Sequence, residues 1–278
     1  MALTLEPLAP FGARIVDPDV DYLLESPDAP DEVMRALEQN CVLLFRGLHL
    51  DDATQLAFAQ RLGEIVVKHT PGWSAEFPGI YRVALDPSAN DELYVKGSWD
   101  WHIDGATMLG APAKASLLSC RVPPGSGGET EFVDTYAAYE RLSREEKERV
   151  GRLKVWHKVR ADAYSTPINL APGMRERLEQ EPAQLHPLVW THRDGRRSLV
   201  LGVTAASVEG LEPAAGRTLL DELLAHATQP SAVLSHTWQV DDVVMWDNRG
   251  TMHRARPYAD DSGRDMHRIT LVGDEPIQ

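Results

Sequence analysis

Apolar residues occur in short runs along most of the chain, and the length of these runs predicts β-strands. Continuous apolar runs of about four to eight residues are typical of strands buried on both faces, and alternating stretches are typical of strands buried on one face. Such segments occur at 41–45, 115–122, 129–133, 187–191, 198–202, 235–240, 243–246 and 268–272. Turn signals separate them, because 123–128 is rich in proline and glycine and Asp194-Gly195 is a typical hairpin dipeptide.

Apolar positions recur at helical spacing in fewer places. The clearest case is 212–228, where Leu219, Leu220 and Leu223 share one face. Ser143 followed three residues later by Glu146 predicts a capping box and a helix over 143–151. Further helices are predicted over 31–40, 51–63 and 134–140. Many short strands with few helices predict a mainly β protein with flanking helices, built on a double-stranded β-helix core of jelly-roll, cupin-like type.

Two stretches show neither the strand pattern nor the helical pattern of apolar positions. Residues 90–101 are polar and contain glycine, which predicts a loop. Residues 160–185 combine prolines with mixed charge, which favours a mobile loop or lid over core structure. We therefore expect a single domain over 1–278, with a lid or insert around 160–185.

The charge balance limits the partners of this chain. Its formal net charge is −14, from 42 acidic and 28 basic residues. This excess repels nucleic acid and anionic membrane surfaces, so we expect neither as a partner. A small anionic substrate stays open, because a few arginines or lysines can dominate the field inside one pocket.

Cysteine content and the N-terminal sequence indicate the cellular compartment in which the protein is expected. Cys41 and Cys120 cannot form a disulfide framework, and ten histidines beside so few thiols indicate a reduced, cytoplasmic protein. Residues 1–17 lack the order of a signal peptide, and no run reaches the ~18 apolar residues that a membrane-crossing helix needs. The oligomeric state is not fixed by the sequence, and a homo-oligomer stays open.

A His-x-Asp motif at 102–104 is the first candidate for chemistry. On a strand, residues two apart point to the same face, so His102 and Asp104 would converge on one point. A distant imidazole would complete a facial triad of two histidines and one carboxylate, and His253, after the strand-like 243–249, is the candidate. Taken alone, however, His-x-Asp is more often an ordinary surface or structural pair.

Several further strings, in a fixed order, carry a resemblance to a known family. They are Trp101-His-Ile-Asp-Gly105, Gly127-Gly-Glu-Thr-Glu-Phe132, Ala137-Ala-Tyr-Glu-Arg-Leu142, Trp246-Asp-Asn-Arg249, His253 and Arg264-Asp-Met-His-Arg268. In order and spacing they resemble the taurine and 2,4-dichlorophenoxyacetate dioxygenase (TauD/TfdA) family, most closely its dichlorophenoxyacetate branch. The resemblance covers the chain from about residue 40 onward. It implies a double-stranded β-helix that uses Fe(II), 2-oxoglutarate and O2, with release of succinate and CO2.

The resemblance also implies roles for individual residues. His102, Asp104 and His253 match the family's metal ligands. Arg264 matches the arginine that binds the distal carboxylate of oxoglutarate, and a planar guanidinium suits that role because it donates two parallel hydrogen bonds. Thr130 matches a hydroxyl that shares this carboxylate. The competing interpretations are a surface arginine for Arg264 and an ordinary strand threonine for Thr130.

The substrate side of the site has three candidates. Arg268 matches a family position that binds the anionic head of the substrate, and His69 resembles a second anion contact. Arg268 could equally support the oxoglutarate site or pair with a carboxylate, and a lone histidine such as His69 is often a plain surface residue. Lys96 could face the substrate from the predicted 90–101 loop, although a solvated lysine is the commoner case.

The nature of the third ligand indicates the reaction. Because Asp104 is a carboxylate and not alanine or glycine, no ligand position is left for a halide, and hydroxylation is expected over halogenation. Hydroxylation beside a heteroatom gives a product that can collapse to cleavage products. Two rival functions stay open: a β-helix protein that binds metal or a small acid without oxidising it, and a zinc hydrolase, although no helical His-Glu-x-x-His is present.

Overall fold

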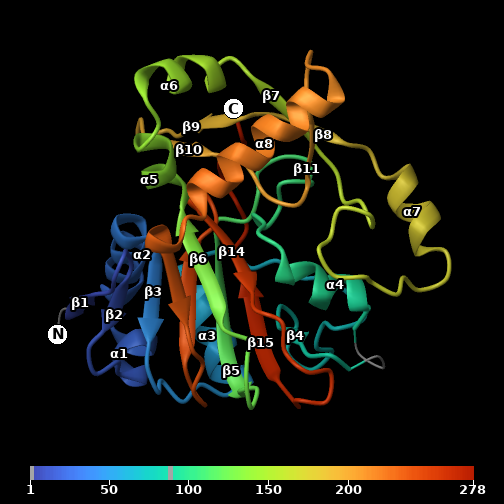
Figure 1. Cartoon of the computed structure of the whole chain (residues 1–278). Helices are drawn as coiled ribbons and strands as arrows, with labels where there is room; N and C mark the ends of the chain where they lie inside the picture. The colour runs from blue at the N-terminus through green and yellow to red at the C-terminus, as the bar shows by residue number, and fades with distance from the viewer. Residues whose placement is uncertain (1–2, 87–89) are drawn as a thin grey trace.

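A large, twisted β-sheet forms the centre of the protein (Figure 1). The computed structural model describes residues 3–86 and 90–278, so residues 1–2 and 87–89 of the expected 1–278 domain lie outside the described residues. Within those ranges seven strands pair in the order β1-β2-β3-β13-β5-β15-β4. Their bounds are Leu5–Pro7, Ala13–Ile15, Val42–Phe45, Val243–Asp247, Ala115–Val122, Asp265–Thr270 and Tyr81–Val83.

A smaller sheet faces the larger one across a buried layer. Its order is β12-β6-β14, with bounds Val233–His236, Thr130–Asp134 and Thr251–Ala255. Phe132 and Leu234 from the smaller sheet pack against Leu118, Val244 and Trp246 from the larger one. Two facing sheets around a shared apolar layer confirm the predicted double-stranded β-helix with flanking helices.

Three helices cover the outer face of the larger sheet. They are α1 (Val20–Glu25), α2 (Ala29–Asn40) and α3 (Asp52–Leu62). Leu43, Phe45 and Met245 point toward them, while their strand neighbours Leu44 and Val244 point into the layer between the sheets. This two-sided burial explains why the central strands are continuous apolar runs.

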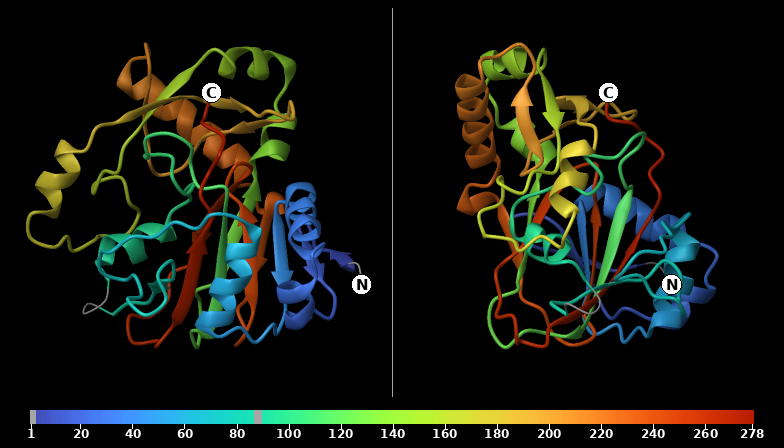
Figure 2. Two further views of the ribbon diagram at one scale, coloured as in Figure 1. Left: turned by 180° about the vertical axis from the view of Figure 1, so that it is seen from behind. Right: turned by 90° about the vertical axis from the view of Figure 1, so that its right-hand side faces the viewer.

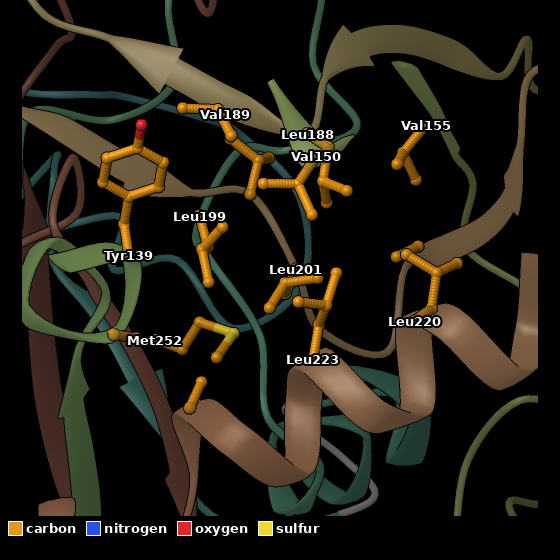
Figure 3. Packing of buried hydrophobic residues seen from close by; sticks show 14 of the residues in the cluster. Tyr139, Val150, Val155, Leu188, Val189, Leu199, Leu201, Leu220, Leu223 and Met252 are labelled. Atoms are coloured by element: carbon orange, nitrogen blue, oxygen red, sulfur yellow. The ribbon is translucent and has the colours of Figure 1, made fainter. Parts of the chain in front are cut away.

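A second group of elements packs against one end of the smaller sheet, above β6 and β14 in Figure 1, and Figure 3 shows the buried side chains of this group. Helix α8 (Pro213–Ala227) packs here through Leu220 and Leu223, and Val133 and Met252 reach it from β6 and β14. The other elements of this group are α5 (Thr135–Glu140), α6 (Arg144–Val150), β7 (Lys154–His157), β8 (Gln184–Pro187), β9 (Val189–Thr191), β10 (Arg197–Leu199), β11 (Ala205–Val208) and η2 (Pro230–Ala232).

The remaining elements lie beside the β14 and β15 edge of the molecule. Helix α4 (Glu92–Lys96) continues into η1 (Gly97–Trp99), and the segment 160–185 runs past α4 and contains α7 (Met174–Gln180), as both views in Figure 2 show in yellow and teal. The described part of the chain contains no helix long and apolar enough to cross a membrane.

Most predicted elements are confirmed, with a few corrections. Strand β5 has the predicted bounds, and α6 begins with the predicted Ser143–Glu146 capping box. The prediction of a loop over 90–101 was wrong, because Asp91 caps α4 by accepting a hydrogen bond from the backbone N–H of Leu93. The strands expected at 235–240 and 268–272 lie at β12 and β15, earlier in the chain. At the start of β15 the polar residues Asp265 and His267 obscured the pattern.

Candidate metal and oxoglutarate site

Backbone hydrogen bonds join the two candidate histidine ligands. His253 lies on β14, and His102 pairs with it through a single bridge in which each backbone N–H donates to the other residue's carbonyl at 3.0 Å. The two imidazole centroids are 4.1 Å apart. The motif was expected at a junction between a loop and a strand, with both side chains on one strand face; instead, His102 forms only this bridge and the chain turns directly after it.

The turn after His102 brings Asp104 to both imidazoles. Gly105 has a φ of 93°, a left-handed conformation that favours glycine, and it reverses the chain behind Asp104. The carboxylate oxygens of Asp104 lie 3.9 Å from Nε2 of His102 and 3.8 Å from Nε2 of His253. One ligand atom from each residue falls within 4.8 Å of the others, which suits a single divalent cation.

The electrostatics of the three residues favour a cation. Burial lowers the pKa of His253 well below its usual range, so its imidazole is neutral and keeps a lone pair for a metal. Burial alone would raise the pKa of Asp104, but the Arg268 guanidinium and the two imidazoles outweigh it and hold that pKa well below its usual range. Asp104 is therefore an anion at neutral pH.

A chain of polar side chains holds Asp104 from behind. Ser116 donates to Oδ2 of Asp104 at 3.0 Å, Asn248 donates to Ser116 at 3.0 Å, and Trp246 donates to the Asn248 side chain at 2.8 Å. Neither Ser116 nor Asn248 is among the site residues that the sequence pattern predicts. The available signals were a serine inside the apolar run 115–122 and the Trp246-Asp-Asn-Arg249 string.

Arg264 is a buried guanidinium that lacks a full set of partners. Its residue is 3% exposed, and its Nε has no hydrogen-bond partner among the described residues. Burial lowers its pKa, and the guanidinium lies 4.8 Å from the centre of the Tyr258 ring. A Cβ at Gly128 would lie 3.3 Å from Arg264, so the glycine leaves room for this side chain. A buried cation of this kind fits the carboxylate of a bound acid.

Thr130 contributes a buried hydroxyl from β6. Its Oγ1 accepts a hydrogen bond from Trp238 Nε1 at 3.0 Å, so the hydroxyl proton is free to donate elsewhere. Thr130 pairs with Ala255 in the smaller sheet and lies two residues after Gly128. Strand β6 therefore carries the Thr130 hydroxyl two residues beyond Gly128, where the chain passes next to Arg264.

The three substrate candidates lie in different surroundings. Arg268 is beside the triad, with Nη1 3.4 Å from Asp104 Oδ1 and its guanidinium over Tyr81 at 5.3 Å. Lys96 forms ion pairs with Glu92 at 2.7 Å and Asp260 at 3.1 Å. His69 is exposed, and no hydrogen bond or ion pair joins its side chain to another described residue.

Lys96 also lines a cavity of about 790 Å³ between α4 and the 160–185 segment. Asn169 and Ala171 form the wall on the side of that segment, and Asp260 lies opposite. Among the described residues that line it, none belongs to the His102, Asp104 and His253 triad. The structure therefore brings Arg268 to the triad and places Lys96 in a neighbouring space.

The fold and the triad together define a class of protein. Two imidazoles and one carboxylate that leave adjacent coordination positions open, inside a double-stranded β-helix, are typical of non-haem iron oxygenases. The model of the family described as "Taurine catabolism dioxygenase TauD, TfdA family" matches residues 4–270. The chain therefore belongs to this family and is an Fe(II)- and 2-oxoglutarate-dependent dioxygenase. The predicted resemblance is confirmed.

Individual relatives agree with this assignment. The chain is 37% identical over 295 residues to the α-ketoglutarate-dependent 2,4-dichlorophenoxyacetate dioxygenase of Cupriavidus pinatubonensis, with 100% of both sequences covered. It is 31% identical over 296 residues to the α-ketoglutarate-dependent sulfate ester dioxygenase of Pseudomonas putida, covering 100% of this chain and 92% of the relative. The crystal structure of AAD-2 in complex with Mn(II) and N-oxalylglycine superposes with a TM-score of 0.82 at 33% identity, covering 100% of both chains.

Proposed function

We propose that the enzyme hydroxylates a small organic acid, a carboxylate or a sulfonate, with metal ligation by His102, Asp104 and His253. The observation that carries the proposal is the convergence of these three side chains beside the guanidinium of Arg268. The buried Arg264, whose Nε has no hydrogen-bond partner among the described residues, adds to it. A bound cation would be held by the three triad residues, and two bound anions would pair with the guanidiniums of Arg264 and Arg268.

Arg264 and Thr130 are proposed to bind the distal carboxylate of 2-oxoglutarate. Support comes from the burial of both side chains and from the unpartnered Nε of Arg264. When bound, iron and oxoglutarate supply the oxidant, with loss of CO2 and formation of succinate. The protein side chains bind, orient and exclude water from the two acids.

Arg268 is proposed to bind the anionic head of the substrate, with His69 and Lys96 as further contacts at the entrance. The relatives named for 2,4-dichlorophenoxyacetate and for sulfate esters have anionic substrates in common. Because Arg268 also contacts Asp104, a substrate anion on Arg268 would place its neighbouring carbon close to the metal side of the site.

The expected product is a hydroxylated acid. Asp104 occupies the third protein ligand position, which disfavours halogenation. Where the hydroxylated carbon carries an ether or sulfonate group, the product collapses to cleavage products. We infer a cytoplasmic location, supported by the two cysteines, both of which are buried and unpaired.

Oxygen consumption that requires both Fe(II) and 2-oxoglutarate tests the proposal. A panel of aryloxyacetates, alkyl sulfonates and alkyl sulfate esters should contain acids that raise succinate release above the substrate-free rate. His102→Ala should lose this activity by about 1,000-fold or more, since it removes a metal ligand, while the exposed residue His49 changed to asparagine serves as the matched control. Turnover by His102→Ala, or hydrolysis without oxygen uptake, would contradict the assignment.

A further inference from the structure

The 160–185 segment is attached to the stretch of chain that leads into the metal motif. Ser165 donates its backbone N–H to Asp100 Oδ2 at 3.0 Å, Asn169 donates its backbone N–H to Glu92 at 3.1 Å, and Arg177 donates to the Tyr94 hydroxyl at 3.0 Å. All three acceptors lie within 92–100. The position of the segment is therefore fixed against α4 and the residues that immediately precede His102.

Packing of Tyr164 adds to this attachment. A Cβ at Gly97 would lie 3.2 Å from the Tyr164 ring, so the ring sits closely on the backbone of η1. Burial, together with the nearby Asp100 carboxylate, raises the pKa of Tyr164 to about 12. Tyr164 and Ser165 thus form a joined contact with 97–100, next to the ligand motif.

Asp100 contacts the segment and the metal ligand at the same time. Its side chain accepts from Ser165, and its backbone carbonyl lies 2.9 Å from Nδ1 of His102. A hydrogen bond from Nδ1–H to this carbonyl fixes the tautomer that leaves Nε2 free, and Nε2 is the atom that faces Asp104. Nδ1 of His253, in contrast, has no partner among the described residues.

We propose that Asp100 is a positioning residue that couples the 160–185 segment to the orientation of His102. The inference rests on the proposed role of His102 as a metal ligand. When the segment is attached, the Asp100 side chain is held and its carbonyl keeps the imidazole aligned. When the segment detaches, that carbonyl loses its restraint and the alignment of His102 loosens. Metal binding and segment attachment therefore stabilise each other.

Three variants separate this coupling from a loss of structure. Asp100→Ala removes the acceptor for Ser165 but keeps the backbone carbonyl for His102, and Asp100→Asn restores an oxygen acceptor. Tyr94→Phe is the matched control, because it breaks the contact with Arg177 on the same segment without touching Asp100. Co(II) is the metal probe, and trypsin reports detachment through cleavage after Arg160, Arg175 and Arg177.

The expected results differ between the variants. Co(II) should slow tryptic cleavage of 160–185 in the wild type, in Asp100→Asn and, from a faster starting rate, in Tyr94→Phe. Asp100→Ala should lose this protection, bind Co(II) about tenfold more weakly and show an altered Co(II) absorption spectrum. Asp100→Ala with wild-type Co(II) affinity and protection would overturn the proposal. Failure of the metal assignment itself is distinguishable, because His102→Ala would then bind Co(II) like the wild type.

Discussion

Arg264 is costly for the protein to keep when no acid is bound. A buried guanidinium loses its hydration, and the aromatic ring of Tyr258 replaces only part of it. Such a residue lowers the stability of the empty enzyme and raises its affinity for an anion. The stability and the oxoglutarate affinity of the protein should therefore respond in opposite directions to its removal.

The substitution Arg264→Met tests whether stability and oxoglutarate affinity change in opposite directions. The apo variant should unfold with a free energy about 1 kcal/mol or more above that of the wild type, because an uncompensated buried charge is replaced by an apolar group. Its KM for oxoglutarate should rise about 100-fold or more, since a buried charge pair is lost. Unfolding of the apo proteins measures the first effect, and succinate release at varied oxoglutarate concentration measures the second.

A control arginine lies in the same part of the chain. Arg256 is about half exposed, so Arg256→Met should change neither the unfolding free energy nor the KM appreciably. An Arg264→Met protein that oxoglutarate stabilises as strongly as the wild type, at the same concentrations, would show that the distal carboxylate binds elsewhere.

Whether an element could be predicted depended on what its side chains face. Strand β5 was predicted in full because it is buried on both faces and most of its residues are apolar. Strand β14 was not recognised as a strand, because His253 faces the site and Arg254 pairs with Glu131. Functional side chains thus broke the pattern that would have revealed the strand beneath them.

The cluster of His102, Asp104 and His253 could be predicted, but the way in which the backbone holds it together could not. The spacing in His102-Ile-Asp104 indicated convergence on a strand, whereas convergence arises from a bridge to β14 and a turn at Gly105. The support from Ser116 and Asn248 joins strands that are far apart in sequence. Contacts of that kind depend on sheet order, which local periodicity does not contain.

The sheet β11-β7-β8 carries a pH-sensitive group. His157 on β7 is fully buried, its Nδ1 lies 3.0 Å from the Thr204 hydroxyl, and burial followed by the neighbouring His186 lowers its pKa from 6.5 to about 3. The unfolded chain therefore binds a proton between pH 6.5 and 3 that the folded protein does not. The free energy of unfolding should fall as the pH falls through this window and should be unaffected by this group above it.

His157→Asn tests this contribution, since asparagine keeps a polar atom near Thr204 but does not titrate. Between about pH 6 and about pH 4, the wild type should lose up to about 1.4 kcal/mol per pH unit more than the variant. Denaturant unfolding at several pH values measures the difference. Parallel pH profiles for the two proteins would refute the assignment to His157.

At the scale of the whole molecule, β6 and β14 carry side chains both to the group around α8 and to the space between the two sheets. On β6, Phe132 packs between the two sheets while Val133 packs against the group around α8. On β14, Met252 faces that same group while His253 faces the metal site. Unfolding of either region would therefore pull these strands away from the other region and expose its buried side chains.

We therefore predict one cooperative unfolding transition for the chain. Calorimetry should give a single peak whose calorimetric and van't Hoff enthalpies agree, and Co(II) should shift the whole peak upward. Two peaks, with only one shifted by Co(II), would show that the group around α8 unfolds separately and that the chain contains more than one domain.

The backbone bridge between His102 and His253 also bears on which ion the enzyme carries. Because backbone hydrogen bonds fix the two residues next to each other, we expect the site to accept divalent ions of similar size with little rearrangement. Affinity then follows the general order for divalent transition metals, in which nickel, copper and zinc bind such ligands more tightly than iron. Occupancy by iron is thus decided by which ions the surroundings supply, and an excess of zinc would leave a correctly folded protein that cannot consume oxygen.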